Sequence, residues 1–190
     1  MMVAAAILAG GRGKRLGNAQ KALVEVGGTP IVARQLAVLE PLTDEQIIVA
    51  GDTKPYEGFG ARLVTDLHPG AGPLAGLESA LAATRADALL VFACDLPFLA
   101  AAFVTALRDA PATAEAVVAR LDGKAQPLAA RYARSILPRV QRRLSKDKLR
   151  MLDLVAELDP EWLDFPAGTR ALYNVNTPEE LARAEELAKP

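Results

Sequence analysis

An apolar run that ends abruptly in a glycine-rich, cationic loop opens this 190-residue chain and restricts its fold more than any other feature. Residues 3–8 contain no polar side chain, which is typical of a strand buried on both faces. Glycines let a backbone approach a ligand closely, and exposed backbone N–H groups can form an anion-binding concavity. The sequence therefore predicts a polyphosphate site at the carboxyl edge of a parallel sheet. The glycines and cations of this region are Gly10, Gly11, Arg12, Gly13, Lys14, Arg15, Gly17 and Lys21.

Two known phosphate motifs fit this loop poorly. No register gives the Gly-x-x-x-x-Gly-Lys-Ser/Thr pattern of a P-loop. Gly11 and Gly13 begin a Gly-x-Gly-x-x-Gly dinucleotide fingerprint, but its third position is Leu16, and residues 18–28 lack the apolar period of a helix. A dinucleotide site and a plain glycine-rich turn with solvated cations stay as alternatives.

Predicted strands and helices alternate along the rest of the chain, which indicates an α/β fold with a three-layer α/β/α, Rossmann-like architecture and a mostly parallel sheet. Asp122 and Gly123 form a hairpin-like turn, so we expect a mixed sheet. Thr177, Pro178 and Glu180 complete a capping box before the last helix. Strands are expected at 22–26, 46–50, 62–65, 88–93, 116–120 and 126–130, and helices at 30–40, 74–84, 100–108, 132–144, 150–158 and from 178 onward.

Composition limits the classes of function. The chain is 51% apolar and 24% charged, and its length suits a single domain covering residues 1–190. A net charge of −1 provides no global field that would attract nucleic acid or an anionic membrane. Cys94 and His68 are the only residues of their types, so an internal disulfide and a zinc site are excluded. No secretory or membrane-spanning segment is visible, and we expect a cytoplasmic enzyme.

Carboxylates follow three of the predicted strands, at Asp52, Asp66 and Asp95. Because the carboxyl ends of parallel strands share one edge of a sheet, these groups should lie near the glycine-rich loop. Mg²⁺ binds one or two carboxylates together with substrate phosphates and water. Asp95 is the best metal candidate because it ends the most apolar strand, although a cap or turn role stays open for it and for the other two carboxylates.

A second cationic cluster lies in the predicted helix 132–144 and the residues after it. A solvated helix face is the ordinary explanation for such a run. Its separation from the first cluster also allows a second, anionic substrate to bind there. The cluster consists of Arg139, Arg142, Arg143, Lys146, Lys148 and Arg150.

A cationic glycine loop combined with metal-binding carboxylates, and without an obvious nucleophile or general base, suits phosphoryl or nucleotidyl transfer. That reaction depends mainly on positioning and on charge neutralisation. An attacking group that is already an ionised phosphate requires no base.

Several short motifs, taken together and in order, resemble the molybdenum cofactor guanylyltransferase (MobA) family of nucleotidyltransferases with a GT-A-like Rossmann fold. The resemblance implies transfer of GMP from GTP to the terminal phosphate of molybdopterin, with release of pyrophosphate and a requirement for Mg²⁺. It also implies GTP and molybdopterin as substrates, other cofactor-biosynthesis proteins as potential partners, and a monomer or weak oligomer. The motifs are residues 8–21, Asp66, and residues 72–76, 94–98, 126–128 and 174–179.

The resemblance further implies roles for individual residues. Arg15, Lys21 and Asp95 would be catalytic, and Asp95 and Asn176 would hold the metal ion. Asn176 also has a structural explanation, because it lies beside the capping box. The implied GTP-binding residues are Leu8, Ala9, Gly10, Gly11, Lys21, Asp52, Asp66 and Asp95.

The chain departs from the usual family pattern at four positions. Gly13 replaces Ser or Thr, Leu16 replaces Met, Gln20 replaces Asp, and Asp52 often corresponds to Asn. Other hypotheses are a related enzyme that uses CTP or a sugar 1-phosphate, and a non-catalytic nucleotide-binding domain. The cytidylyl relatives tend to carry Leu-Ala-Ala-Gly, so the resemblance favours guanine over cytosine where Gly10 is followed by Gly11.

Overall fold

A mixed seven-stranded sheet forms the centre of the fold, which is known from a computed structural model that describes residues 1–10, 12–13, 19–111 and 113–189. Strand order is β11-β9-β10-β8-β1-β6-β7. Strand β10 runs antiparallel to both neighbours, whereas the other pairings of this sheet are parallel. The strands are β1 (Val3–Leu8), β6 (Glu45–Ala50), β7 (Arg62–Thr65), β8 (Ala88–Ala93), β9 (Ala116–Leu121), β10 (Lys124–Ala133) and β11 (Glu161–Phe165).

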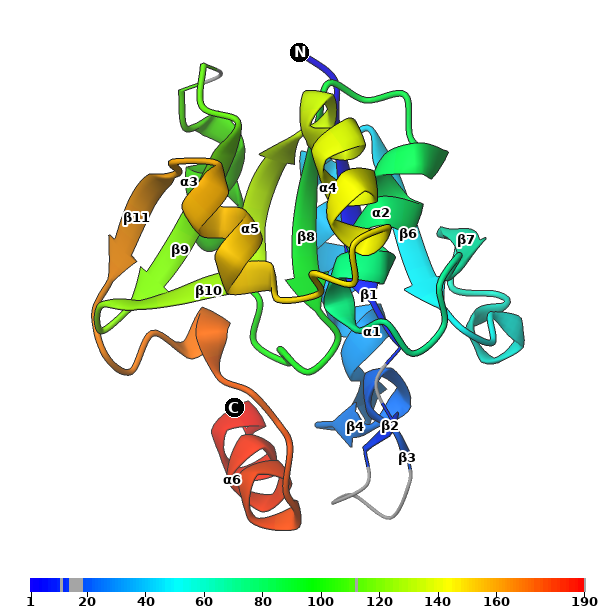
Figure 1. Cartoon of the computed structure of the whole chain (residues 1–190). Coiled ribbons are helices and arrows are strands. Elements are labelled where there is room, and N and C mark those ends of the chain that lie inside the picture. Colours follow the sequence, from blue (N-terminus) through cyan, green and yellow to red (C-terminus); the bar gives the residue numbers. More distant parts are fainter. Residues whose placement is uncertain (11, 14–18, 112, 190) are drawn as a thin grey trace.

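Helices cover both faces of the sheet and confirm the predicted three-layer architecture (Figure 1). Strand β1 is buried along its whole length, and its side chains alternate between the hydrophobic cores on the two faces of the sheet. Ala5 and Ile7 pack with α1 (Ile31–Leu39) and α3 (Ala101–Asp109) on one face. Ala4 and Ala6 pack with α2 (Pro73–Ala83), α4 (Leu137–Leu144) and α5 (Met151–Glu157) on the other. An apolar run without alternation is therefore what the central strand of this sheet requires.

The last helix lies beyond the carboxyl edge of β1 and β8, apart from the two main layers (Figure 1). This helix, α6 (Pro178–Ala188), packs against β4 (Glu25–Val26), which pairs with β5 (Thr29–Pro30). Val26, Val175 and Ala184 belong to the small third core that joins them. The packing brings the C-terminal segment close to the 3₁₀ turn Lys21–Leu23, which follows the short pair β2 (Arg12–Gly13) and β3 (Ala19–Gln20).

Most of the predicted elements occur near their predicted positions. The strands at 62–65 and 88–93 match to the residue, and β8 occupies the middle of the sheet. Asp122 and Gly123 both have positive φ, of 49° and 72°, as a tight hairpin turn requires. The capping box at Thr177 is present, with hydrogen bonds in both directions between Thr177 and Glu180.

Two predictions were wrong in detail, and one strand was not predicted. Residues 132–133 do not begin a helix but end β10, where Tyr132 pairs with Leu89 of β8, and α4 begins only at Leu137. Tertiary pairing thus overrides the local helical pattern. The extended segment predicted at 22–26 is partly the 3₁₀ turn, and the edge strand β11 was not anticipated.

Candidate active site

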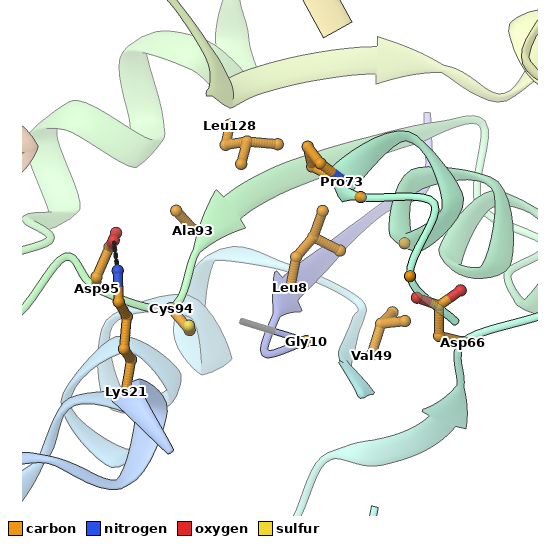
Figure 2. A pocket seen from close by; sticks show the side chains of 13 residues that line it. Leu8, Gly10, Lys21, Val49, Asp66, Pro73, Ala93, Cys94, Asp95 and Leu128 are labelled. Atoms are coloured by element: carbon orange, nitrogen blue, oxygen red, sulfur yellow. Dashed lines mark hydrogen bonds and ion pairs between the residues drawn. The ribbon is translucent and has the colours of Figure 1, made fainter. Parts of the chain in front are cut away.

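A pocket of about 390 Å³ opens at the carboxyl edge of the sheet (Figure 2). Leu8 at the end of β1, Val49 near the end of β6 and Ala93 at the end of β8 form its base. Asp95 and Lys21 stand on one side of the pocket, and Asp66 stands on the opposite side. The strand-end argument therefore finds the pocket correctly.

The N-terminus of α2 forms one wall of the pocket through Gly72, Pro73 and Gly76. Gly72 has φ 77° and ψ −164°, a conformation that is essentially restricted to glycine. A Cβ atom on Gly76 would lie 3.2 Å from Leu8 Cδ2, so a glycine here lets the helix approach the end of β1 closely. The free N–H groups and dipole of a helix N-terminus favour an anionic ligand.

A cation and two oxygen-bearing side chains meet at the other side of the pocket. Lys21 Nζ lies 3.4 Å from Asp95 Oδ2 and also donates a hydrogen bond to Asn176 Oδ1. The side chains of Lys21 and Asp95 are only 20% and 16% exposed. Three segments that are distant in sequence thus place an ammonium group between a carboxylate and an amide oxygen.

Burial shapes the electrostatics at the end of β8. Desolvation raises the pKa of Asp95 above its usual value, and the charge of Lys21 offsets only part of this effect. Burial also raises the pKa of the neighbouring Cys94 thiol to about 12, with a further contribution from the Asp95 charge. Cys94 therefore remains a neutral, apolar wall of the pocket.

Helix α1 supports the loop that carries Asp95. Gln35 Nε2 donates to the carbonyl oxygen of Ala93 at 2.8 Å, and Arg34 Nε donates to that of Pro97 at 2.9 Å. Gln35 is fully buried, and its Oε1 atom has no partner among the described residues. Sequence reasoning missed both supports, because the only signal was a pair of polar residues within an amphipathic helix.

The residues predicted to bind GTP occupy different places. Leu8, Gly10, Lys21, Asp66 and Asp95 line the pocket. Gly11 lies outside the described residues, as does Arg15, which is predicted to be catalytic, so the roles of both stay predictions.

Two other predicted nucleotide residues do not line this pocket. Ala9 is buried, and its backbone N–H donates to the carbonyl oxygen of Val49 at 2.8 Å, as a continuation of the sheet. Asp52 is exposed and accepts a hydrogen bond from the backbone N–H of Lys54 at 3.1 Å, within a turn. Contact of either residue with GTP stays a prediction.

The second cationic cluster contains two residues with clear structural partners. Arg139 forms an ion pair with Glu115 at 2.9 Å, and the buried Arg143 pairs with Glu157 and, at 3.7 Å, with Asp153. Arg143 thereby joins α4 to α5. The remaining cations of the cluster lie toward or beyond the C-terminal end of α4, which points to the same edge of the sheet as the N-terminus of α2 (Figure 1).

A mostly parallel sheet with an anion-favouring helix N-terminus and a cation–carboxylate pair at its carboxyl edge is typical of an α/β protein that binds a phosphorylated ligand. The comparisons with known proteins narrow this class. The chain belongs to the family described as MobA-like NTP transferase domain, whose model matches residues 5–160. The protein is therefore a nucleotidyltransferase.

Individual relatives cover nearly the whole chain. "Probable molybdenum cofactor guanylyltransferase" of Chloroflexus aggregans is 34% identical, over 95% of this chain and 92% of its own length. Molybdenum cofactor guanylyltransferase of Pseudomonas paraeruginosa is 33% identical, over 95% and 93%. The crystal structure of molybdopterin-guanine dinucleotide biosynthesis protein A from Archaeoglobus fulgidus superimposes with a TM-score of 0.79 at 27% identity and covers 97% of both chains.

Proposed function

We propose that the pocket binds GTP together with Mg²⁺, and that the protein transfers GMP from GTP to the terminal phosphate of molybdopterin. The names of the relatives support this reaction. The structural observation that carries the proposal is the meeting of Lys21, Asp95 and Asn176 at the end of β8.

The two sides of the pocket suit the two ends of a nucleotide. Lys21 favours the triphosphate. Leu8 and Val49 provide an apolar surface, and Asp66 supplies a hydrogen-bond acceptor on the side away from Lys21 (Figure 2). We therefore place the nucleoside between this surface and Asp66.

The residues beside Lys21 fit a divalent cation. Asp95 Oδ2 and Asn176 Oδ1 both face the Lys21 ammonium group, so their oxygens already surround a positive charge. Among the described residues no three His, Cys, Asp or Glu side chains gather, so phosphate oxygens and water would complete the shell, as Mg²⁺ prefers. Enzymes of this family generally use a divalent metal ion. When bound, Mg²⁺ neutralises charge on the reacting phosphates.

The reaction needs orientation and charge neutralisation more than proton transfer. An ionised phosphate oxygen of molybdopterin attacks the α-phosphorus of GTP and forms a new P–O bond. The bond between the α-phosphorus and its bridging oxygen breaks, and the electron pair leaves with pyrophosphate. Lys21 stabilises the negative charge on the triphosphate during this step. The exposed cations after α4 are our candidates for holding the acceptor's phosphate.

Calorimetric titration with GTP, CTP and ATP, each with and without Mg²⁺, tests nucleotide choice. We expect GTP to bind more tightly than the others, and only with Mg²⁺. Preference for CTP would identify a cytidylyltransferase of the same fold. Pyrophosphate release with a sugar 1-phosphate but not with molybdopterin would show that the acceptor is a sugar phosphate. Nucleotide binding without turnover of either acceptor would indicate a non-catalytic domain.

We also propose that residues 1–190 form one domain that acts in the cytoplasm as a monomer or weak oligomer and binds neither nucleic acid nor membrane. Relatives that match over 92–93% of their own length support the domain assignment. Separately, no helix in the described ranges is long and apolar enough to cross a membrane. Light scattering after size exclusion and cell fractionation test these points.

A further inference from the structure

The N-terminus of α6 carries one hydrogen bond more than its capping box requires. In a capping box the N3 carboxylate accepts from the backbone N–H of the N-cap residue. Here Glu180 Oε2 accepts from the N–H of Thr177, the N-cap residue, at 3.1 Å. The same oxygen accepts a shorter bond, of 2.7 Å, from the N–H of the preceding residue, Asn176.

This additional bond fixes the residue whose side chain enters the candidate metal site. Val175, just before Asn176, is buried in the third core, and its N–H donates to the carbonyl oxygen of Asp95 at 3.0 Å. The backbone N–H groups of two consecutive residues are therefore both held, one by the Asp95 loop and one by Glu180. The Asn176 side chain projects from this fixed segment and accepts from Lys21 Nζ.

We propose that Glu180 is a positioning residue that holds the Asn176 side-chain oxygen beside Asp95, a role separate from its stabilisation of α6. The inference rests on the proposed function, because it takes Asp95 and Asn176 as the metal-side pair. Mutation of a residue that hydrogen-bonds to a metal ligand and fixes its orientation typically weakens metal binding by about 10–100-fold. The stability of α6 alone would not require the bond to Asn176.

Three variants separate positioning from helix stability. Glu180→Ala removes both bonds to Oε2. Thr177→Ala removes the hydroxyl that accepts from the Glu180 N–H at 3.2 Å and leaves the Glu180 carboxylate in place. Glu180→Gln keeps an oxygen that can accept from both N–H groups but removes the charge.

The readouts are the Mn²⁺ dissociation constant with GTP present, from electron paramagnetic resonance, and Tm without ligands. We expect Glu180→Ala to raise this constant by about tenfold or more. Thr177→Ala should lower Tm as much as Glu180→Ala does but leave Mn²⁺ binding near wild type. Glu180→Gln should restore Mn²⁺ binding to near wild type.

Any of three results would overturn the inference. Equal weakening of Mn²⁺ binding by Thr177→Ala and Glu180→Ala would mean that Glu180 acts only by capping the helix. Failure of Glu180→Gln to restore Mn²⁺ binding would mean that the charge of Glu180, and not its hydrogen bond to Asn176, affects the metal. Asp95→Ala distinguishes this failure from that of the proposed function. If Asp95→Ala abolishes Mn²⁺ binding and Glu180→Ala does not weaken it, only the inference fails. If neither variant affects Mn²⁺ binding, the metal site and the inference both fail.

Discussion

Lys21 and Asp95 are 74 positions apart in the sequence, yet the Lys21 ammonium group lies 3.4 Å from Asp95 Oδ2 in a site that is mostly shielded from water. The same ammonium group contacts Asn176. Lys21 therefore occupies the position between the two oxygens that we assign to the metal ion. Binding of metal and triphosphate should move this ammonium group from the two oxygens to the phosphates.

Replacement of Lys21 tests this exchange. Lys21→Met should weaken GTP binding by about 10–100-fold, because a hydrogen bond to a charged group contributes about 1.5–3 kcal/mol. The same change should strengthen Mn²⁺ binding in the absence of nucleotide, since the competing cation is gone. Calorimetry measures both constants, with the exposed Lys54→Met as a matched control. Unchanged GTP binding would remove Lys21 from the triphosphate site.

Asp95→Asn should raise Tm while it abolishes turnover. Burial raises the pKa of Asp95, so the folded state binds a proton more tightly than the unfolded state, where the usual value is 3.8. Stability is therefore lost as the pH rises through the folded-state pKa, and at pH 7 the ionised carboxylate opposes folding.

The gain in Tm should thus be largest near neutral pH and should shrink as the pH approaches 3.8. Calorimetric melting of wild type and Asp95→Asn from pH 4 to pH 8 measures this difference. A variant that melts below wild type at pH 7 would mean that the attraction of Lys21 outweighs the cost of burial.

Cys94 should be chemically inert in the folded protein. With a pKa of about 12, its thiolate fraction at pH 8 is on the order of 10⁻⁴, and the side chain is buried. We expect a disulfide reagent such as dithiobis(nitrobenzoate) to react with it at pH 8 only at the rate of unfolding. Reaction in the native protein as fast as in urea would contradict the burial of this thiol.

Gly72 should be intolerant of a side chain. Gly72→Ala places a Cβ atom on a backbone with φ 77° and ψ −164°, at a cost of about 1–3 kcal/mol in the free energy of unfolding. Gly51→Ala is the matched control, because Gly51 has open space around a Cβ atom and lacks a positive φ. Urea unfolding compares the two, and equal stabilities would show that the turn before α2 is not strained.

The sequence predicts the fold well where a segment is completely buried. It predicts the fold poorly where pairing with another strand determines whether a segment is helical or extended. Residues 88–93 are apolar throughout, and an apolar run of this length is typical of a strand that is buried on both faces of a sheet. Tyr132, by contrast, lies in a segment with both helical and extended character, and its partner across the sheet decides the outcome. Strand β11 pairs only at the sheet edge, and its mixed sequence carries no clear period.

The site was predictable only in part. The position of Asp66 and Asp95 follows from strand ends, whereas only the family resemblance indicates Asn176 as a metal-side residue, and its contact with Lys21 spans 155 positions. Gln35 could not be found, because a single polar residue in a helix gives no indication that it supports a loop on another element.

The most direct test of the account is a product assay. Wild type and Asp95→Asn are each incubated with GTP, Mg²⁺ and molybdopterin, and the products are identified by mass spectrometry. We predict that wild type forms the guanine dinucleotide of molybdopterin and one pyrophosphate per product, and that Asp95→Asn forms neither. Absence of the dinucleotide with wild type, or its formation at an undiminished rate by Asp95→Asn, would contradict the account.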